Sequence, residues 1–288
     1  MSAISGRALH YVFKIGDRGK NSFFFRQILG MKVLRHEEFK EGCDAACNGP
    51  YDNRWSKTMV GYGPESSHFV IELTYNYGVS SYEMGNDFGG VTIYSKDILS
   101  RAAEHSYPVT QVAGKKGSLL TSPDGYKFFV IDQPSGDSDP VKSVELSVSN
   151  LQNSKKYWHN LLKMKVLEES EESVRLSYGD KQASLQITQI AEPINRAKAY
   201  GRIAFAIPSA EQPPLSEAVT AAGGAILTPL ITLDTPGKAT VTVVILGDPD
   251  GHEICFVDEE GFGQLSQVDP DGENLLIKNI AKDPFQPK

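Results

Sequence analysis

The sequence predicts an α+β fold built from four repeated units, each made of a strand, a helix and several further strands. Three observations lead to this prediction. The 288 residues are enough for about two domains. The second half of the chain repeats the pattern of the first. Each half also contains two apolar strands that lead into a helix-like stretch.

The clearest repeat relates residues 10–34 to residues 143–167 without a gap. In each copy an apolar strand leads to an N-cap-like residue, then to apolar residues at helical spacing, then to a second strand. The N-cap positions are Asp17 and Asn150. Gly30 suits the position just after a helix, whereas Lys163, its counterpart, is a weaker choice there.

A second repeat relates residues 123–132 to residues 249–258, each a Pro-Asp-Gly turn followed by an apolar strand. Between the copies runs a polar stretch rich in Pro, Gly and Ser. We therefore expect a first domain at 5–132, a linker at 133–140, a second domain at 141–258 and a C-terminal tail at 259–288. In the tail, residues 272–282 fit either a short docking helix or a frayed end.

Composition narrows the class of protein. Hydrophobic residues make up 40% and charged residues 23%, a mix typical of globular proteins. The net charge of -7 argues against a nucleic-acid-binding protein, and no apolar run reaches the ~18 residues of a membrane span. Three cysteines make no disulfide framework and the start of the chain lacks a signal-peptide pattern, so we expect a cytoplasmic protein, with the mitochondrion as the alternative.

Alternation along two strands predicts a polar concavity. His10, Val12 and Lys14 share one strand face, and Glu72 and Asn76 share another. If the two strands are neighbours, these side chains line the hollow face of a curved sheet. The simpler alternative is the solvated face of an ordinary antiparallel sheet.

Five segments resemble the glyoxalase I family of the vicinal-oxygen-chelate superfamily. They are the strand from His10, residues 72–78, Phe88-Gly-Gly-Val-Thr, the turn at Pro123, and the loop 41–61. Over residues 5–258 the resemblance implies four βαβββ modules that form two glyoxalase-like domains with curved mixed sheets. In that family a zinc or nickel ion binds the enediolate oxygens of a glutathione hemithioacetal, and a metal-bound Glu moves the proton.

The resemblance also implies where metal ligands would stand. The first and fourth modules would complete one site with His10, Glu72, Arg202 and Cys255. The second and third modules would complete another with Gly90, Phe129, Ser143 and Gln186. Arg202 is a permanent cation that cannot ligate a metal, so we expect it to pair with Glu72 in the metal's place. We expect no bound metal at either site, zinc or nickel being the alternative, and Glu72 is the one candidate catalytic residue.

The residues that would bind glutathione match the family pattern better than the metal ligands do. Lys14 stands where the family uses an Arg for the glutathione carboxylate, Asn76 matches a family contact, and Arg202 is a third candidate. The implied function is a monomeric glyoxalase I-like protein that binds a small thiol conjugate or carbonyl metabolite without lyase activity. The alternative is a catalytically inactive scaffold for protein partners. Cys43 and Cys47 are either free thiols or a reversible redox pair.

Overall fold

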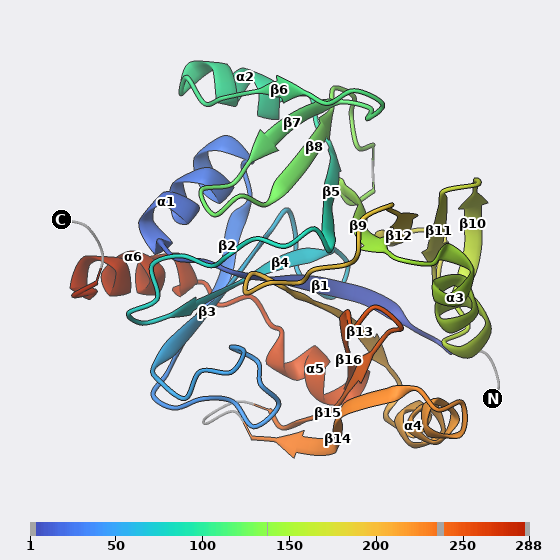
Figure 1. Cartoon of the computed structure of the whole chain (residues 1–288). Coiled ribbons are helices and arrows are strands. Elements are labelled where there is room, and N and C mark those ends of the chain that lie inside the picture. The colour runs from blue at the N-terminus through green and yellow to red at the C-terminus, as the bar shows by residue number, and fades with distance from the viewer. Residues whose placement is uncertain (1–3, 137, 235–238, 286–288) are drawn as a thin grey trace.

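The computed structural model describes residues 4–136, 138–234 and 239–285, which form two eight-stranded mixed sheets with helices packed against them (Figure 1). The predicted α+β fold class is confirmed. Residue 137 of the expected linker and residues 286–288 of the expected tail lie outside the described residues. No helix in the described ranges is long and apolar enough to cross a membrane.

The elements in chain order are β1 (Arg7–Lys14), α1 (Arg18–Phe23), η1 (Phe24–Ile28), β2 (Lys32–Phe39), β3 (Trp55–Gly61), β4 (Val70–Asn76), β5 (Phe88–Tyr94), α2 (Ile98–Glu104), β6 (Thr110–Gln111), β7 (Ser118–Thr121), β8 (Lys127–Ile131), β9 (Val141–Val148), α3 (Leu151–Lys155), η2 (Lys156–Leu161), β10 (Lys165–Glu169), β11 (Ser173–Ser177), β12 (Ser184–Gln189), β13 (Arg202–Ile207), η3 (Ser209–Glu211), α4 (Gln212–Ala221), β14 (Ala225–Leu233), β15 (Val241–Gly247), β16 (Glu253–Asp258), α5 (Glu259–Leu265) and α6 (Gly272–Lys282).

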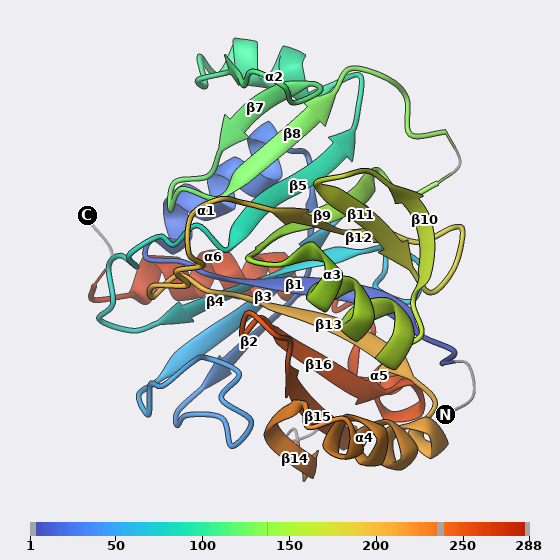
Figure 2. The ribbon, with the colours of Figure 1, turned by 45° about the vertical axis from the view of Figure 1, so that its right-hand side comes forward.

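Each sheet combines strands from both halves of the sequence. The first sheet has the order β14-β15-β16-β13-β1-β4-β3-β2, and the second has β10-β11-β12-β9-β5-β8-β7-β6. β1 runs antiparallel to β13, and β5 antiparallel to β9, so these two pairings join the modules. Figure 2 shows β1 and β13 side by side in the middle of the molecule. The predicted domain boundaries remain a proposal, because both sheets extend across them.

The duplication is kept in local detail. The Asp17 carboxylate accepts a hydrogen bond from the Lys20 amide at 2.9 Å, and the Asn150 side chain accepts one from the Asn153 amide at 2.9 Å. Both caps are therefore confirmed. After each short helix comes a π-helical turn, η1 or η2, that ends near a residue with positive φ: 73° at Gly30 and 62° at Lys163. The backbone geometry is retained at Lys163 although only glycine adopts it freely.

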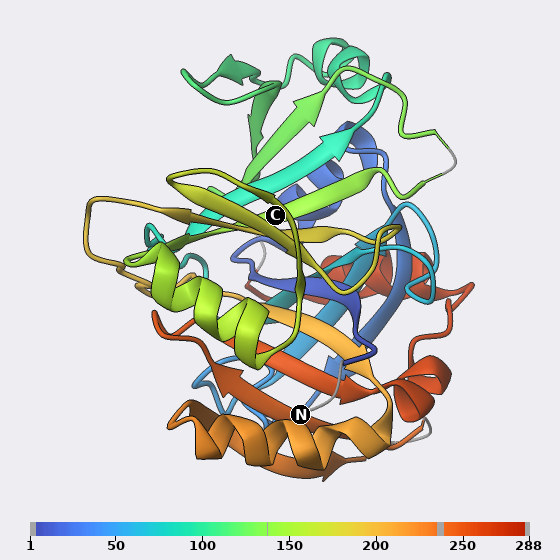
Figure 3. The ribbon, with the colours of Figure 1, turned by 90° about the vertical axis from the view of Figure 1, so that its right-hand side faces the viewer.

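Side-chain alternation along β1 separates core from concavity, as predicted. Tyr11 and Phe13 are buried in the main apolar core. There the Phe13 ring stacks on the ring of Tyr126, the residue just before β8 of the second sheet, at a centroid distance of 4.0 Å. His10 and Lys14 point to the opposite face. The helix α4 covers the outer side of β14–β16, along the lower edge of Figure 3.

The tail is a docked element rather than a frayed end. α5 lies against β13, β15 and β16, and α6 packs on β2. Leu276 of α6 is buried, and the Asp269 amide donates to the Leu34 carbonyl at 2.8 Å, which fixes the start of α6. Of the two alternatives for residues 272–282, the docking helix is the one observed.

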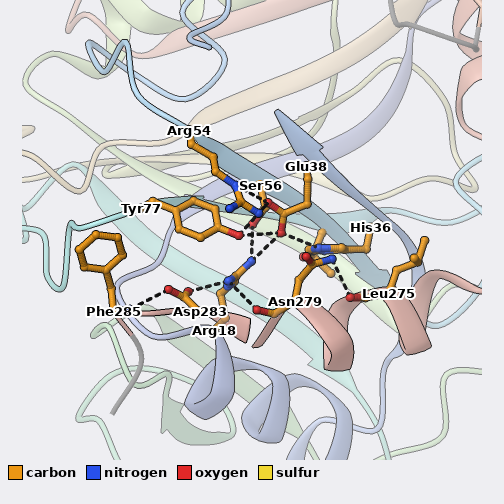
Figure 4. A network of polar contacts seen from close by, with 11 residues as sticks. Arg18, His36, Glu38, Arg54, Ser56, Tyr77, Leu275, Asn279, Asp283 and Phe285 are labelled. Carbon is orange, nitrogen blue, oxygen red and sulfur yellow. Dashed lines mark hydrogen bonds and ion pairs between the residues drawn. The ribbon is translucent and has the colours of Figure 1, made fainter. Parts of the chain in front are cut away.

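A buried ion network ties α6 to the first module (Figure 4). The Arg18 guanidinium donates to the Asp283 carboxylate at 2.6 Å, to the Asn279 carbonyl at 3.1 Å and to Glu38 at 2.8 Å. Burial opposes ionisation of Glu38, but hydrogen bonds from His36 and Tyr77 and the charge of Arg18 outweigh it and lower the pKa of Glu38 to about 2. The tail is therefore held by a guanidinium that has almost no access to water.

Replacing Arg18 by alanine should lower the free energy of unfolding by about 3–5 kcal/mol, because Asp283 stays buried without its cation. The matched control is Arg26→Ala, which removes a tail contact to Glu273, a side chain that is 48% exposed. That change should cost about 0–1 kcal/mol. Urea unfolding followed by tryptophan fluorescence gives both values, and equal losses in the two variants would contradict the central place of Arg18.

Candidate functional site

The first sheet brings four predicted ligand positions to one small cavity. His10 on β1, Glu72 on β4, Arg202 on β13 and Cys255 on β16 all line a space of about 100 Å³. In the strand register Val12 lies opposite Glu72 on one side and opposite Arg202 on the other. The first and fourth modules therefore share a concavity, which we call the first concavity.

His10 is held between two carboxylates. Its Nδ1 lies 2.6 Å from Glu65 Oε1, and its Nε2 lies 3.6 Å from Glu72 Oε2. Glu65 is only 1% exposed and forms an ion pair at 3.2 Å with Arg35, also buried. Burial raises the pKa of Glu65, but the charges of His10 and Arg35 outweigh it, so the pKa is lowered overall.

Arg202 does not take the predicted partner. Its guanidinium donates to Glu253 Oε2 at 2.8 Å and 3.0 Å, and to the carbonyls of Ala45 and Ala46 at 2.9 Å and 3.2 Å. Within the part of the chain that the structure describes, no ion pair joins Arg202 to Glu72. The predicted pair is wrong because Glu253 is the direct cross-strand neighbour of Arg202, whereas Glu72 lies two strands away, roughly 10 Å across the sheet.

The residues of the first concavity do not fit the metal of the glyoxalase reaction. An open site for enediolate oxygens needs several N and O ligands, and Arg202 offers none. Burial raises the pKa of the Cys255 thiol to about 11, with Arg202 lowering it by less. His10 and Glu72 alone are two donors, fewer than the three protein ligands of a catalytic zinc site. No group of three or more metal-binding side chains is found among the described residues.

The tail and one loop contribute to the wall of the first concavity. Phe262 and Leu265 of α5 line it from the tail side, and the Phe262 ring centroid lies 6.1 Å from that of His10. On the other side runs the β2–β3 loop, whose residues 41–51 we call the cover loop. Cys43 and Cys47 of the cover loop form a disulfide with a Cα–Cα distance of 5.4 Å.

Lys14 and Asn76, the two residues predicted to contact glutathione, both form contacts with other residues of the chain. Lys14 is 4% exposed, donates to the Tyr200 carbonyl at 2.9 Å, and lies 3.2 Å from the centroid of the Tyr200 ring. Burial, opposed by the charge of Glu253, lowers the pKa of Lys14 to about 7. Asn76 is fully buried and exchanges hydrogen bonds of 2.9 Å and 3.1 Å with Asn48 of the cover loop.

The second sheet forms a larger and open concavity of about 520 Å³, which we call the second concavity. Of the second predicted quartet, Phe129, Ser143 and Gln186 line it. Gly90 does not, and a Cβ placed on it would lie 2.7 Å from the Phe129 ring. A histidine therefore has no room at position 90, and the other three side chains are poor metal ligands.

Charged side chains surround the second concavity. The basic ones are Lys115, Lys116, Lys142 and Arg175, and the acidic ones are Glu145, Glu168 and Glu172. The Lys115 ammonium lies 2.6 Å from the Glu145 carboxylate, and Arg175 pairs with Glu168 at 2.9 Å. This size and mixture of charges suit a small ligand that carries both anionic and cationic groups.

Sequence reasoning missed three residues that shape the first concavity. Glu65 and Asn48 lie in irregular loops, where no periodicity indicates the direction of a side chain. Glu253 stands two residues before Cys255 on the same strand, so alternation alone places it on the same face. That signal was available and would have identified the neighbour of Arg202.

Replacing Glu65 by glutamine should lower the free energy of unfolding at pH 7 by about 1.5–3 kcal/mol, because His10 and Arg35 lose a charged acceptor. The folded-state pKa of Glu65 is lowered, so its contribution is present above the ordinary value of 4.5 and is lost as pH falls through the folded value.

The difference between wild type and Glu65→Gln should therefore shrink below pH 4.5. Chemical denaturation across pH 3–7 measures it, with the exposed Glu171→Gln as control. A difference that stays constant over this range would contradict the assigned network.

Comparisons with known proteins agree with this geometry. A family model described as Glyoxalase domain-containing protein 4-like, C-terminal domain, matches residues 150–265. The chain is 53% identical to Glyoxalase domain-containing protein 4 of Rattus norvegicus, with 97% of this chain and 94% of the relative covered. It is 45% identical to Glyoxalase 1 of Caenorhabditis elegans, with 97% and 98% covered.

Among solved structures, a variant of glyoxalase I from Zea mays superimposes with a TM-score of 0.75 at 26% identity, covering 89% of this chain and 94% of the maize protein. Both sheets of the fold and the pairing of modules are thus those of glyoxalase I. The chain belongs to the glyoxalase domain-containing protein 4 family, glyoxalase I-like proteins with the vicinal-oxygen-chelate fold.

Proposed function

We propose that this chain is a glyoxalase I-like protein with a degraded metal site, which binds a small thiol conjugate or carbonyl metabolite and lacks ordinary lactoylglutathione lyase activity. The observation that carries the proposal is the position of Arg202. A guanidinium stands where the family has a ligand, and Glu253 and two loop carbonyls hold it there. Protonation of Cys255 at neutral pH removes a further donor.

Purified protein should contain far less than one equivalent of zinc or nickel and should not isomerise the methylglyoxal–glutathione hemithioacetal. Elemental analysis and a lyase assay with each metal added test this. A relative is named Glyoxalase 1, so turnover is a real competing outcome. About one bound metal per chain together with turnover would overturn the proposal.

A restored ligand set provides the matched positive control. The double substitution Arg202→His and Cys255→Glu gives the first concavity four N and O donors with His10 and Glu72. Calorimetric titration should show zinc binding to this variant and none to wild type. Equal binding by the two proteins would mean that the metal sits elsewhere.

The second concavity is the ligand site we favour. It is open and has the volume of a small-molecule site, whereas the side chains of the first concavity are occupied by α5 and the cover loop. Lys115 and Lys116 can bind the carboxylates of a thiol conjugate such as an S-alkyl glutathione, and Glu172 can bind its ammonium group. Four basic and three acidic side chains line this cavity, an excess of one positive charge that complements the single net negative charge of an S-alkyl glutathione.

S-methylglutathione at about 100 times its dissociation constant should raise the melting temperature by roughly 5 °C, equivalent to about 2.7 kcal/mol. Lys115→Ala with Lys116→Ala should abolish the shift, and the exposed Lys156→Ala should retain it. Loss of the shift in Lys14→Met instead would locate the ligand in the first concavity. No shift with any thiol conjugate or carbonyl compound would contradict binding.

A catalytically inactive scaffold is the second candidate. The observation that favours it is the small size of the first concavity, about 100 Å³, with the chain's own Phe262 and Leu265 in its lining. We propose a monomer in either case, because the duplication supplies within one chain the modules that complete each sheet. Cytoplasmic residence, with the mitochondrion as alternative, is likewise a proposal.

A further inference from the structure

The cover loop contacts all three residues predicted to bind a ligand, Lys14, Asn76 and Arg202. Asn48 binds Asn76, and the carbonyls of Ala45 and Ala46 bind Arg202. Gly49 packs so closely on Lys14 that a Cβ at this position would lie 3.0 Å from Lys14 Cε. These contacts come from a single stretch of five residues.

The Cys43–Cys47 disulfide closes a ring that contains Ala45 and Ala46 and ends just before Asn48. Within the ring the Ala46 amide donates to the Cys43 carbonyl at 2.8 Å, and just beyond it the Gly49 amide donates to the Ala46 carbonyl at 3.0 Å. Ala46 has a φ of 50°, a left-handed conformation that alanine seldom adopts. A crosslink that removes open conformations of the loop favours this unusual turn over alternatives.

The two cysteines of the disulfide are neither fully buried nor fully exposed. Cys43 and Cys47 are both partly exposed, and Cys47 also lines the cavity beside His10, Arg202 and Cys255. The disulfide therefore lies in the same loop that contacts the predicted ligand-binding residues, and it retains some exposure to solvent.

We propose that Cys43 and Cys47 are a reversible redox site whose oxidation state controls access to the first concavity. One small-molecule thiolate attacks the disulfide, forms a mixed disulfide and releases a cysteine thiolate, which takes up a proton. A second thiolate attacks the mixed disulfide at the small-molecule sulfur and releases the other cysteine. Two thiols are thereby oxidised to one small disulfide, and the protein disulfide is reduced to two thiols. A small disulfide reverses the reaction.

Reduction releases the turn at Ala46 and with it the contacts to Asn76, Arg202 and Lys14. The first concavity then becomes accessible to small molecules. This control is independent of ligand binding in the second concavity, which no residue of the cover loop lines.

The reactivity of Cys255 reports whether the first concavity is accessible. The chain has three cysteines, and Cys255 is the free one when the disulfide is formed. Its rate of alkylation by iodoacetamide, followed by peptide mass spectrometry at one pH, should be low in oxidised protein. The rate should rise roughly tenfold after reduction by glutathione and removal of the thiol, because Cys255 is only partly exposed and lines the same cavity as Cys47, so that opening of the cover loop exposes it further. Cys43→Ser with Cys47→Ser should be as fast as the reduced protein.

Two further variants separate the loop contacts from the redox chemistry. Asn48→Ala removes the contact to Asn76 and should make Cys255 react faster in oxidised protein. Asp44→Ser, at an exposed position of the same loop, should leave the oxidised and reduced rates unchanged. Equal Cys255 rates in oxidised and reduced wild type would overturn the proposal even if the double serine variant fails to fold. Failure of glutathione disulfide to form the Cys43–Cys47 bond would overturn it as well.

Discussion

The antiparallel pairing of β1 with β13 is the interaction on which the rest of the structure depends. A single βαβββ module ends in an unpaired strand, and an exposed row of backbone amides and carbonyls invites pairing with another chain. Here the partner comes from the other half of the same chain, and β5 pairs with β9 in the same way. Each pairing doubles a curved sheet and creates one concavity between two modules. It also decides which side chains, more than one hundred residues apart in sequence, face one another.

The two concavities are built from equivalent strands, but the segments that follow the equivalent strands β16 and β8 differ. β16 ends at Asp258, whose carboxylate accepts from the Gly261 amide at 2.6 Å and so begins α5 at once. The helix turns back over the first sheet and places Phe262 in its hollow. At the equivalent point of the second sheet, Asp132 is followed by Gln133 and Pro134 and the chain leads away into the linker. The second concavity therefore stays open. One local start signal for a helix explains the difference between two sites of common origin.

Charged side chains in and near the first concavity pair with the closest group of opposite charge. Three guanidinium groups with little exposure are each paired with a nearby carboxylate: Arg202 with Glu253 and Arg35 with Glu65 around the first concavity, and Arg18 with Asp283 at the tail. An isolated charge in such a place is costly, so a guanidinium at this position needs a counter-ion beside it. The counter-ion of Arg202 is Glu253 on the adjacent strand, and the remaining guanidinium donors bind carbonyls of the cover loop. The Arg202 guanidinium thus links the β13–β16 pair of strands to the cover loop.

The sequence by itself determined the periodic features: the fold class, the duplication, the caps at Asp17 and Asn150, and the faces of β1 and β4. These follow from residue type and spacing over a few positions, where local backbone geometry dominates. It also identified His10, Glu72, Arg202 and Cys255 as one set, through a resemblance that carries the pairing of modules. Only the tertiary structure decided that Arg202 binds Glu253, that Glu65 supports His10, and that Asn48 occupies Asn76. Strand register and irregular loops decide which side chains come within about 3 Å of one another. No local pattern in the sequence encodes such distances.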